Sequence, residues 1–415
     1  GVTIITGGPG TGKTTTINTI LQVFEQEGLD ILLAAPTGRA AKRMSETTGW
    51  EAQTIHRLLE INGGVSEGDT QGTMHFERNE KQPLEADVVI IDEFSMVDIY
   101  LMNALLRAIV PGTRLIIVGD VNQLPSVGPG NVLKDMIQAE FCSVVRLHRI
   151  FRQAAESQIV MNAHRINSGE EISLENASPD FMHLERKDSA SVINVVVQLI
   201  MQKLPPHVDA SPYDIQVLTP TRKGELGVEH LNQVLQQYMN PADAGKVERE
   251  FHGVLFREKD KVMQIKNDYQ IRWTKKTSLG DVYEEGTGVF NGDTGIIREI
   301  IPVAEQVVVE FEEGKMVEYE YSQMDEMELA YAITIHKSQG SEYPAIVLPV
   351  LGGPKMLLGR NLLYTAVTRA KKCVTTVGSS RVIQGMIHNV NEQKRFSSLC
   401  QRIKEMEEED AELNH

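Results

Sequence analysis

The chain has 415 residues, a length that suits roughly two to four domains, and 41% of its residues are hydrophobic. No apolar run approaches the ~18 residues of a membrane span, so we expect no membrane partner. The net charge of −16 argues against a nucleic-acid partner, but it includes an acidic tail at residues 401–415, which we expect to be solvated or disordered. Three widely spaced cysteines, Cys142, Cys373 and Cys400, exclude a local metal knuckle and favour the reducing cytoplasm.

The first motif is a glycine-rich loop at residues 7–14, Gly-Gly-Pro-Gly-Thr-Gly-Lys-Thr. It follows an apolar strand pattern and precedes a stretch with apolar residues on one helical face. In this context the glycines let backbone N–H groups surround a polyphosphate at a helix N-terminus. We expect Lys13 to reach the β- and γ-phosphates and the Thr14 hydroxyl to ligate Mg²⁺. The predicted nucleotide-binding residues here are Gly7, Gly8, Pro9, Gly10, Thr11, Gly12, Lys13, Thr14 and Thr15.

Apolar runs in the first 150 residues predict parallel strands that are buried on both faces. They lie at residues 2–6, 31–35, 88–91 and 115–118. A polar segment follows each run, and ligands of open α/β sheets bind at the carboxyl ends of such strands. After the third run, we expect Asp92 to hold Mg²⁺ and Glu93 to orient and deprotonate the attacking water. After the fourth run, we expect the Gln123 amide to hydrogen-bond the γ-phosphate.

A second α/β pattern begins at about residue 144, and a region of many short antiparallel strands interrupts it. We therefore predict an α/β fold with two similar lobes and a β-barrel inserted in the second lobe. In the first lobe, residues 61–84 indicate an inserted β-hairpin, and a disordered loop is the alternative. The predicted boundaries are 1–143 for the first lobe, 144–223 and 329–400 for the second lobe, 224–328 for the barrel, and 401–415 for the tail.

Two arginines of the second lobe are candidates for contact with the nucleotide. They are Arg152, in Phe-Arg-Gln, and Arg369, in Ala-Val-Thr-Arg-Ala-Lys. An arginine from a neighbouring lobe can stabilise the charge that builds on a transferred phosphoryl group. Hydrolysis then depends on closure of the lobes, and this dependence couples chemistry to movement.

Eight motifs follow one another along the chain. In order they are residues 7–14, Ala-Pro-Thr-Gly-Arg-Ala-Ala at 35–41, Thr-Ile-His-Arg-Leu-Leu at 54–59, Asp-Glu at 92–93, residues 119–125, Phe-Arg-Gln at 151–153, Ile-His-Lys-Ser-Gln-Gly-Ser-Glu at 335–342 and residues 364–371. Together they resemble the motifs of superfamily 1 helicases, and most closely the RecD-like branch of 5′→3′ DNA helicases. The resemblance implies two RecA-like lobes with ATP and Mg²⁺ between them and single-stranded DNA across both. It also implies a β-hairpin pin in the first lobe and an SH3-like barrel in the second.

Residue by residue, the resemblance implies an ATP site and a DNA site. The ATP-site positions are Lys13, Thr14, Asp92, Glu93, Gln123, Arg152 and Arg369, with Gly340 and Glu342 linking the ATP to the DNA. The DNA-contacting positions are Thr37, His56, Thr334, His336 and Lys337. The family's adenine-recognition segment and amino-terminal domain would precede Gly1, so selectivity for ATP over GTP does not follow from this sequence.

The residue types at the predicted DNA site have a physical rationale of their own. Thr37, Arg39 and His56, with the segment 337–339, offer short donors that suit phosphate oxygens, and such contacts carry no base information. Aromatic residues make up only 6% of the chain, so we expect tracking of phosphates rather than extensive base stacking.

Three functions are open on these grounds. The first is a monomeric ATP-driven motor that unwinds duplex DNA 5′→3′ at junctions with single-stranded DNA, alongside repair or replication proteins. The second is a translocase, or a motor subunit of a nuclease complex, that separates little duplex by itself. The third is a P-loop small-molecule kinase or nucleotide-dependent switch, which would turn over ATP regardless of DNA and leaves the second-lobe motifs unexplained.

Overall fold

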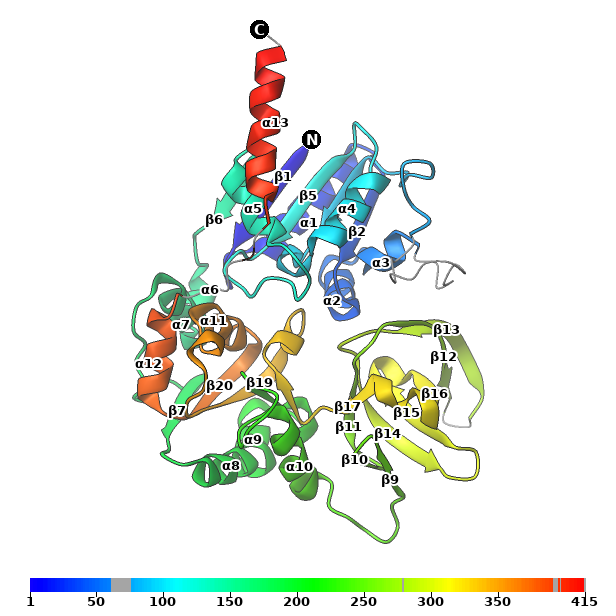
Figure 1. The fold of residues 1–415 in the computed structure, drawn as a ribbon, viewed down its shortest axis with the longest axis vertical. Helices are drawn as coiled ribbons and strands as arrows, with labels where there is room; N and C mark the ends of the chain where they lie inside the picture. The colour runs from blue at the N-terminus through cyan, green and yellow to red at the C-terminus, as the bar shows by residue number, and fades with distance from the viewer. Residues whose placement is uncertain (61–75, 278–279, 391–394, 396, 414–415) are drawn as a thin grey trace.

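The computed structural model describes residues 1–60, 76–277, 280–390, 395 and 397–413, with the backbone alone at residues 152, 153 and 410–413. It contains two α/β lobes and an antiparallel region, residues 248–329, which we call the β-domain. In Figure 1 the first lobe lies at the top, the second lobe at the lower left and the β-domain at the lower right. The three parts meet at the centre of the molecule, and the predicted fold class is confirmed.

The first lobe is built on a six-stranded parallel sheet with strand order β3-β2-β4-β5-β1-β6. Its strands are β1 (Val2–Gly7), β2 (Ile31–Ala35), β3 (Ala52–Thr54), β4 (Val88–Ile91), β5 (Arg114–Gly119) and β6 (Ser143–Leu147). Every residue of β4 is buried, as expected for a strand covered on both faces. The four strands predicted here are confirmed, whereas β3 and β6 are additional. Because β6 pairs with β1, the first sheet continues past the predicted lobe boundary at residue 143.

Helices cover both faces of this sheet. They are α1 (Lys13–Gln26), α2 (Gly38–Thr48), α3 (Ile55–Leu58), α4 (Ile99–Ala108) and α5 (Val132–Ala139). The α1 helix buries Ile17 and Leu21, which lie on its predicted apolar face. At the start of α2, the Thr37 hydroxyl accepts a hydrogen bond from the Ala40 N–H at 3.2 Å and so caps the helix. Most of the predicted β-hairpin, residues 61–75, lies outside the described residues.

The second lobe contains a five-stranded parallel sheet with order β18-β8-β19-β20-β7. Its strands are β7 (Phe181–Glu185), β8 (Gln216–Thr219), β18 (Ala332–Thr334), β19 (Tyr343–Val350) and β20 (Ala370–Gly378). Its helices are α6 (Arg152–Ala155), α7 (Gln158–Ser168), α8 (Ser189–Gln198), α9 (Leu204–Val208), α10 (Val228–Met239), α11 (Arg360–Val367) and α12 (Ser380–His388). None of the helices in the described ranges has the length and apolarity that a membrane crossing requires.

The β-domain consists of a seven-stranded antiparallel sheet, order β13-β12-β16-β15-β14-β11-β17, and the separate pair β9 and β10. The strands are β9 (Glu248–Phe251), β10 (Val254–Arg257), β11 (Lys261–Gln264), β12 (Asp268–Lys276), β13 (Val282–Val289), β14 (Thr294–Ile301), β15 (Gln306–Phe311), β16 (Met316–Glu320) and β17 (Met327–Leu329). One hydrophobic cluster runs from Val217 and Leu231 in the second lobe to Val262 and Tyr319 in the β-domain. This shared core attaches the β-domain to the second lobe.

The α10 helix lies inside the predicted insertion, 224–328, but packs on the second lobe. Its Asn232 side chain donates to the carbonyl of Leu329, the last residue of β17, at 2.9 Å and to that of Ala332, the first residue of the second-lobe strand β18, at 3.0 Å. The helix also contacts α8 of the second lobe. An amide held in this way satisfies backbone groups that a buried strand end would otherwise leave unpaired. The inserted β structure therefore begins after α10 and not at residue 224.

The carboxyl-terminal segment, predicted to be solvated or disordered, is a helix with solvated acidic residues. Residues 399–413 form helix α13 (Leu399–Leu413), which lies along α5 of the first lobe in Figure 1. Leu399 packs on the first-lobe core, and Arg395 donates to the carbonyls of Gly128 (2.6 Å) and Gly130 (2.8 Å). The segment is rich in Glu, Lys, Met and Leu, which are good helix formers. Glu405 and its acidic neighbours up to residue 409 are exposed to solvent, so their charge does not oppose the helix.

Candidate functional site

The glycine-rich loop forms the turn between β1 and α1, as predicted. Gly10 and Gly12 have φ values of +72° and +85°, a left-handed conformation that favours glycine. Lys13, the first residue of α1, donates from Nζ to the carbonyls of Gly7 (2.7 Å) and Gly8 (3.1 Å). The lysine amine and the helix N-terminus therefore lie at the same loop, an arrangement suited to binding phosphates.

Two carboxylates follow β4, next to this loop. Burial, together with the neighbouring charge of Glu93, raises the pKa of Asp92 to about 6, and the charge of Lys13 opposes that rise. Two neighbouring half-buried carboxylates at a phosphate-binding loop form a site that a divalent cation would stabilise. In the described ranges no group of three or more His, Cys, Asp or Glu side chains could hold a metal ion. The carboxylate oxygens of Asp92 and Glu93 are hard ligands of the kind that fit Mg²⁺ together with phosphates and water.

The loop after β5 carries Gln123. Because β5 pairs with β1, this loop and the phosphate loop leave the same edge of the sheet. Gln123 is only 7% exposed, and its Oε1 has no hydrogen-bond partner among the described residues. A buried polar atom without a partner calls for a ligand or water. The unpaired atom is an acceptor, so it suits a water or another donor and not a phosphate oxygen. The contact of the Gln123 amide N–H with a terminal phosphate stays a prediction.

The second lobe contacts the phosphate loop directly. The Phe151 N–H donates to the Gly10 carbonyl at 3.2 Å, and a Cβ placed on Gly12 would lie 2.4 Å from the Phe151 ring. His164 Nε2 lies 3.0 Å from the Pro9 carbonyl oxygen. These contacts bring the start of α6, and with it the backbone of Arg152, to the edge of the loop. The Arg152 side chain lies outside the described residues, so its contact with nucleotide stays a prediction.

Arg369 is 3% exposed and makes hydrogen bonds within the second lobe. Its Nε donates to the Thr365 carbonyl, one terminal nitrogen to the Ser341 carbonyl and the other to the Thr368 hydroxyl, each at 3.2 Å. The guanidinium is therefore held by its own lobe and not by the phosphate loop. The contact of Arg369 with nucleotide therefore stays a prediction.

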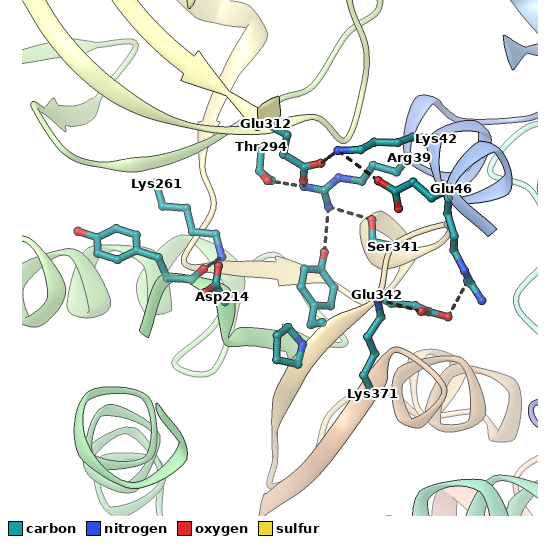
Figure 2. Close-up of a pocket in the computed structure, with 15 residues that line it drawn as sticks. Arg39, Lys42, Glu46, Asp214, Lys261, Thr294, Glu312, Ser341, Glu342 and Lys371 are labelled. Atoms are coloured by element: carbon teal, nitrogen blue, oxygen red, sulfur yellow. Dashed lines mark hydrogen bonds and ion pairs between the residues drawn. The ribbon is translucent and has the colours of Figure 1, made fainter. Parts of the chain in front are cut away.

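A polar cavity of about 280 Å³, the junction cavity, lies where α2, the second lobe and the β-domain meet (Figure 2). Arg39 crosses it, donating to Ser341 Oγ of the second lobe at 2.9 Å and to Glu312 of the β-domain at 3.0 Å, with a further hydrogen bond to Thr294. Lys42 reaches Glu312 and Glu313 as well, at 3.5 and 3.0 Å. Arg39, predicted to contact DNA, therefore joins all three parts of the molecule.

Arg43, one helical turn after Arg39, is a site residue that the sequence motifs did not single out. Its guanidinium lies 2.6 Å from Glu342 of the second lobe and 3.9 Å from Glu93.

The second lobe also approaches the start of α2 closely at Gly340. A Cβ on Gly340 would lie 2.7 Å from Thr37 Oγ1, so the distance between the two backbones requires a glycine here. Gly340 and Glu342, predicted to link the two sites, therefore contact α2. The i, i+4 spacing of Arg39 and Arg43 on α2 was the signal that could have identified this link.

Two smaller cavities, about 120 and 140 Å³, adjoin the β-domain, and we call them the channel cavities. The first lies between the first lobe and the β-domain, and residues of both lobes and the β-domain line the second. The predicted DNA-contacting residues line them: Thr37 and His56 in the first, and Thr37, Arg39, His336 and Lys337 in the second. Thr334 lies beside them, its hydroxyl accepting from the Lys337 N–H at 3.3 Å. Burial lowers the pKa of His56 and of His336, which keeps both imidazoles neutral near pH 7.

The β-domain supplies residues to the first channel cavity that the sequence did not indicate. They are Asn267, Tyr269, Phe290 and Asn291. The rings of Tyr269 and Phe290 are 5.4 Å apart, and the His56 ring lies 6.3 Å from Tyr269. The low aromatic content of the whole chain concealed this local cluster. Its only signal in the sequence was that each aromatic residue adjoins an Asn- and Asp-containing turn.

The fold and the site define a class of protein, the motors that consist of two RecA-like lobes with a phosphate loop of the first lobe at their interface. Family models agree with this class along the chain: an AAA domain matches residues 1–129, the SH3 domain of ATP-dependent RecD-like DNA helicases matches 231–311, and a UvrD-like helicase C-terminal domain matches 329–377. The RecBCD enzyme subunit RecD of Mycolicibacterium smegmatis is 30% identical over 438 residues, 97% of this chain and 73% of that protein. The chain belongs to the RecD-like family of superfamily 1 ATP-dependent DNA helicases.

Other relatives agree with this assignment. The ATP-dependent RecD2 DNA helicase of Deinococcus radiodurans is 35% identical over 402 residues, which cover 97% of this chain; the chain spans half the length of that relative. Among solved structures, the Pif1 helicase of Bacteroides in complex with ADP-AlF3 and ssDNA superposes with a TM-score of 0.52 at 19% identity, covering 98% of this chain and 94% of that one. This structural likeness concerns the fold.

Proposed function

We propose that this chain is a monomeric ATP-driven motor that moves 5′→3′ along single-stranded DNA and unwinds duplex DNA in repair or recombination. The observation that supports it best is that one helix, α2, joins the two predicted sites. Its capping residue Thr37 lines both channel cavities, while Arg43, at the middle of the helix, contacts Glu93 beside the phosphate loop. A change at either site can therefore be transmitted to the other through a rigid element.

Each predicted ATP-site residue has a role in this proposal. The phosphate loop and Lys13 bind the triphosphate, Thr14 and Asp92 hold Mg²⁺, and Glu93 orients and deprotonates the attacking water. Bound Mg²⁺ would neutralise charge on the phosphates. Gln123 donates its amide to the γ-phosphate. Arg152 and Arg369 reach the same phosphate from the second lobe when the lobes close, so that hydrolysis and movement are coupled.

The DNA strand would pass through the channel cavities and contact Thr37, His56, Thr334, His336 and Lys337 through its phosphates. Thr37 is well placed because it lies at the N-terminus of α2, where the helix dipole favours an anion. Arg39 would first have to exchange its present partners, Ser341 and Glu312, before it could contact DNA.

The activity is tested by measuring ATP hydrolysis with and without single-stranded DNA, and strand separation on partial duplexes with a 5′ or a 3′ overhang. We expect DNA to stimulate hydrolysis and only the 5′-overhang substrate to be unwound. Stimulation without unwinding would favour the second candidate, a motor subunit of a nuclease complex, which the similarity to RecBCD subunits suggests. Hydrolysis indifferent to DNA would contradict both.

The substitution Glu93→Gln removes the proposed base while keeping the size of the side chain. We expect ATP binding to persist and DNA-stimulated turnover to fall about 100-fold, the order of magnitude of general-base catalysis. Steady-state ATPase rates and a nucleotide-binding titration measure the two quantities. Glu27→Gln, an exposed glutamate at the end of α1, is the matched control and should behave as wild type.

The substitution Lys337→Ala tests the channel. Lys337 Nζ is 2.8 Å from the Glu328 carboxylate. In the proposed complex, the lysine ammonium would contact both this carboxylate and a DNA phosphate. We expect weaker binding to single-stranded DNA and a slope of log K against log[salt] that is shallower by about 0.7, the loss of one phosphate contact. Fluorescence anisotropy across a salt series measures the slope, and the exposed Lys187→Ala is the control. An unchanged slope would exclude Lys337 from the phosphate contacts.

A further inference from the structure

A tyrosine of the second lobe reaches across the cleft to the first lobe. The Tyr364 hydroxyl, on α11, donates to Asp120 Oδ2 at 2.5 Å, and Asp120 is the first residue of the loop that follows β5. Both residues are 1% exposed, so water does not replace this hydrogen bond. Burial and the Asp120 charge hold the pKa of Tyr364 well above its usual value, so the hydroxyl keeps its proton and acts as the donor.

The next residue of α11 contacts the same loop. The Thr365 hydroxyl accepts from the Leu124 N–H at 2.9 Å, and Gln339 Nε2 donates to the Leu124 carbonyl at 2.6 Å. The second lobe therefore holds both ends of the loop that contains Gln123. Because these hydrogen bonds join different lobes, they exist only when α11 lies against the first lobe.

The same tyrosine lies at the phosphate loop. A Cβ built on Gly8 would be 3.1 Å from the Tyr364 hydroxyl oxygen. On the other side, Lys13 is close enough for its charge to act on Asp120. Tyr364 therefore occupies the point where the phosphate loop, the loop after β5 and the second lobe meet.

Arg369 is coupled to this contact through the backbone of α11. Its Nε donates to the carbonyl of Thr365, the residue that follows Tyr364. When α11 docks on Asp120, the guanidinium is carried with the helix toward the first lobe. Asp120 is the partner that makes this docking specific, because a carboxylate buried without a donor is strongly unfavourable.

We propose that Tyr364 is a positioning residue for ATP hydrolysis: its hydrogen bond to Asp120 stabilises the closed arrangement of the lobes in which Arg369 acts. This inference deepens the proposed function and rests on it. Tyr364 itself does not touch the reacting atoms in this proposal. It acts through α11, and its loss should therefore lower the rate of the step that needs Arg369 rather than the affinity for nucleotide.

The test is Tyr364→Phe, which removes only the hydroxyl. We expect kcat for DNA-stimulated ATP hydrolysis to fall about ten-fold, as for a lost hydrogen bond to a buried charge, with KM for ATP changed less than about two-fold. The matched control is Tyr331→Phe. Tyr331 is also buried and donates to a buried carboxylate, Asp260, at 2.8 Å, but away from the cleft, so its kcat should stay near wild type.

A double substitution separates positioning from general stability. If Tyr364 acts through Arg369, then Tyr364→Phe should cause no further loss of kcat in an Arg369→Ala background. Three outcomes would each overturn the inference. They are losses of kcat that multiply in the double variant, a wild-type kcat in Tyr364→Phe, and an equal loss of kcat in Tyr331→Phe. Failure of the proposed function would appear separately, as a wild-type protein whose ATP hydrolysis does not respond to single-stranded DNA.

Discussion

Arg369→Ala is expected to slow DNA-stimulated ATP hydrolysis by about 10³-fold or more while leaving nucleotide affinity largely unchanged. The reason is that a trans-lobe arginine stabilises charge that develops only as the phosphoryl group is transferred. Ground-state binding depends on the phosphate loop instead. Steady-state turnover and an equilibrium titration with a fluorescent ATP analogue separate these two effects.

The buried position of Arg369 requires a stability control for this experiment. Its guanidinium bonds to Thr365, Ser341 and Thr368, so the alanine variant also loses contacts inside the second lobe. Thermal unfolding of Arg369→Ala should therefore be compared with that of Arg381→Ala, an exposed arginine of the same lobe. Turnover near the wild-type rate in a folded Arg369→Ala protein would contradict the trans-lobe arginine, and with it the coupling of closure to hydrolysis.

Lys13→Ala is expected to reduce hydrolysis to about one thousandth of the wild-type rate or below. Lys13 is the cation at the phosphate loop, where it now bonds to the carbonyls of Gly7 and Gly8. Without it, the loop retains its backbone N–H groups but loses the charge that holds the β- and γ-phosphates. Unlike Arg369→Ala, this variant should also bind ATP more weakly, because the lysine contacts the ground state.

The measurements for Lys13→Ala are the ATPase rate and the ATP dissociation constant, with Lys187→Ala as the control. Lys187 is an exposed lysine between β7 and α8, so its removal should change neither quantity. Hydrolysis within ten-fold of wild type in Lys13→Ala would mean that the glycine-rich loop is not the site of turnover. If Lys13→Ala bound ATP as tightly as the wild type, then Lys13 would stabilise the transition state but not the bound ground state.

Wherever a signal was local, the sequence predicted the structure well. The strands β1, β2, β4 and β5 are short apolar runs in which at least three consecutive residues are buried, and such runs are visible without knowledge of the fold. The glycine-rich loop was equally visible, because its glycines and Lys13 lie in one continuous segment. The motifs around Thr37 and His336 were found because each is a short string of residues.

Where sequence prediction failed, the deciding partner was distant. Strand β6 has a mostly exposed pattern, and only its pairing with β1 assigns it to the first sheet. Helix α10 is assigned to the second lobe by contacts with β18, among them a hydrogen bond from Asn232 to the Ala332 carbonyl, 100 residues away. The acidic residues of α13 suggested a solvated or disordered end and gave no sign of a helix. Packing of Leu399 on the first lobe supplies an apolar contact that the charge pattern did not reveal.

The sequence by itself determined the fold class, the phosphate loop and the strand-end carboxylates, because each depends on contiguous residues and on the side-chain period of strands and helices. Only the tertiary structure decided which lobe each element joins, that Arg39 and Arg43 connect three parts of the molecule, and that Tyr364 meets Asp120 across the cleft. These contacts join residues up to about 300 positions apart, and no local pattern encodes them. They form because burial at the interfaces makes an unpaired polar group unfavourable, so each must find a partner in another part of the fold.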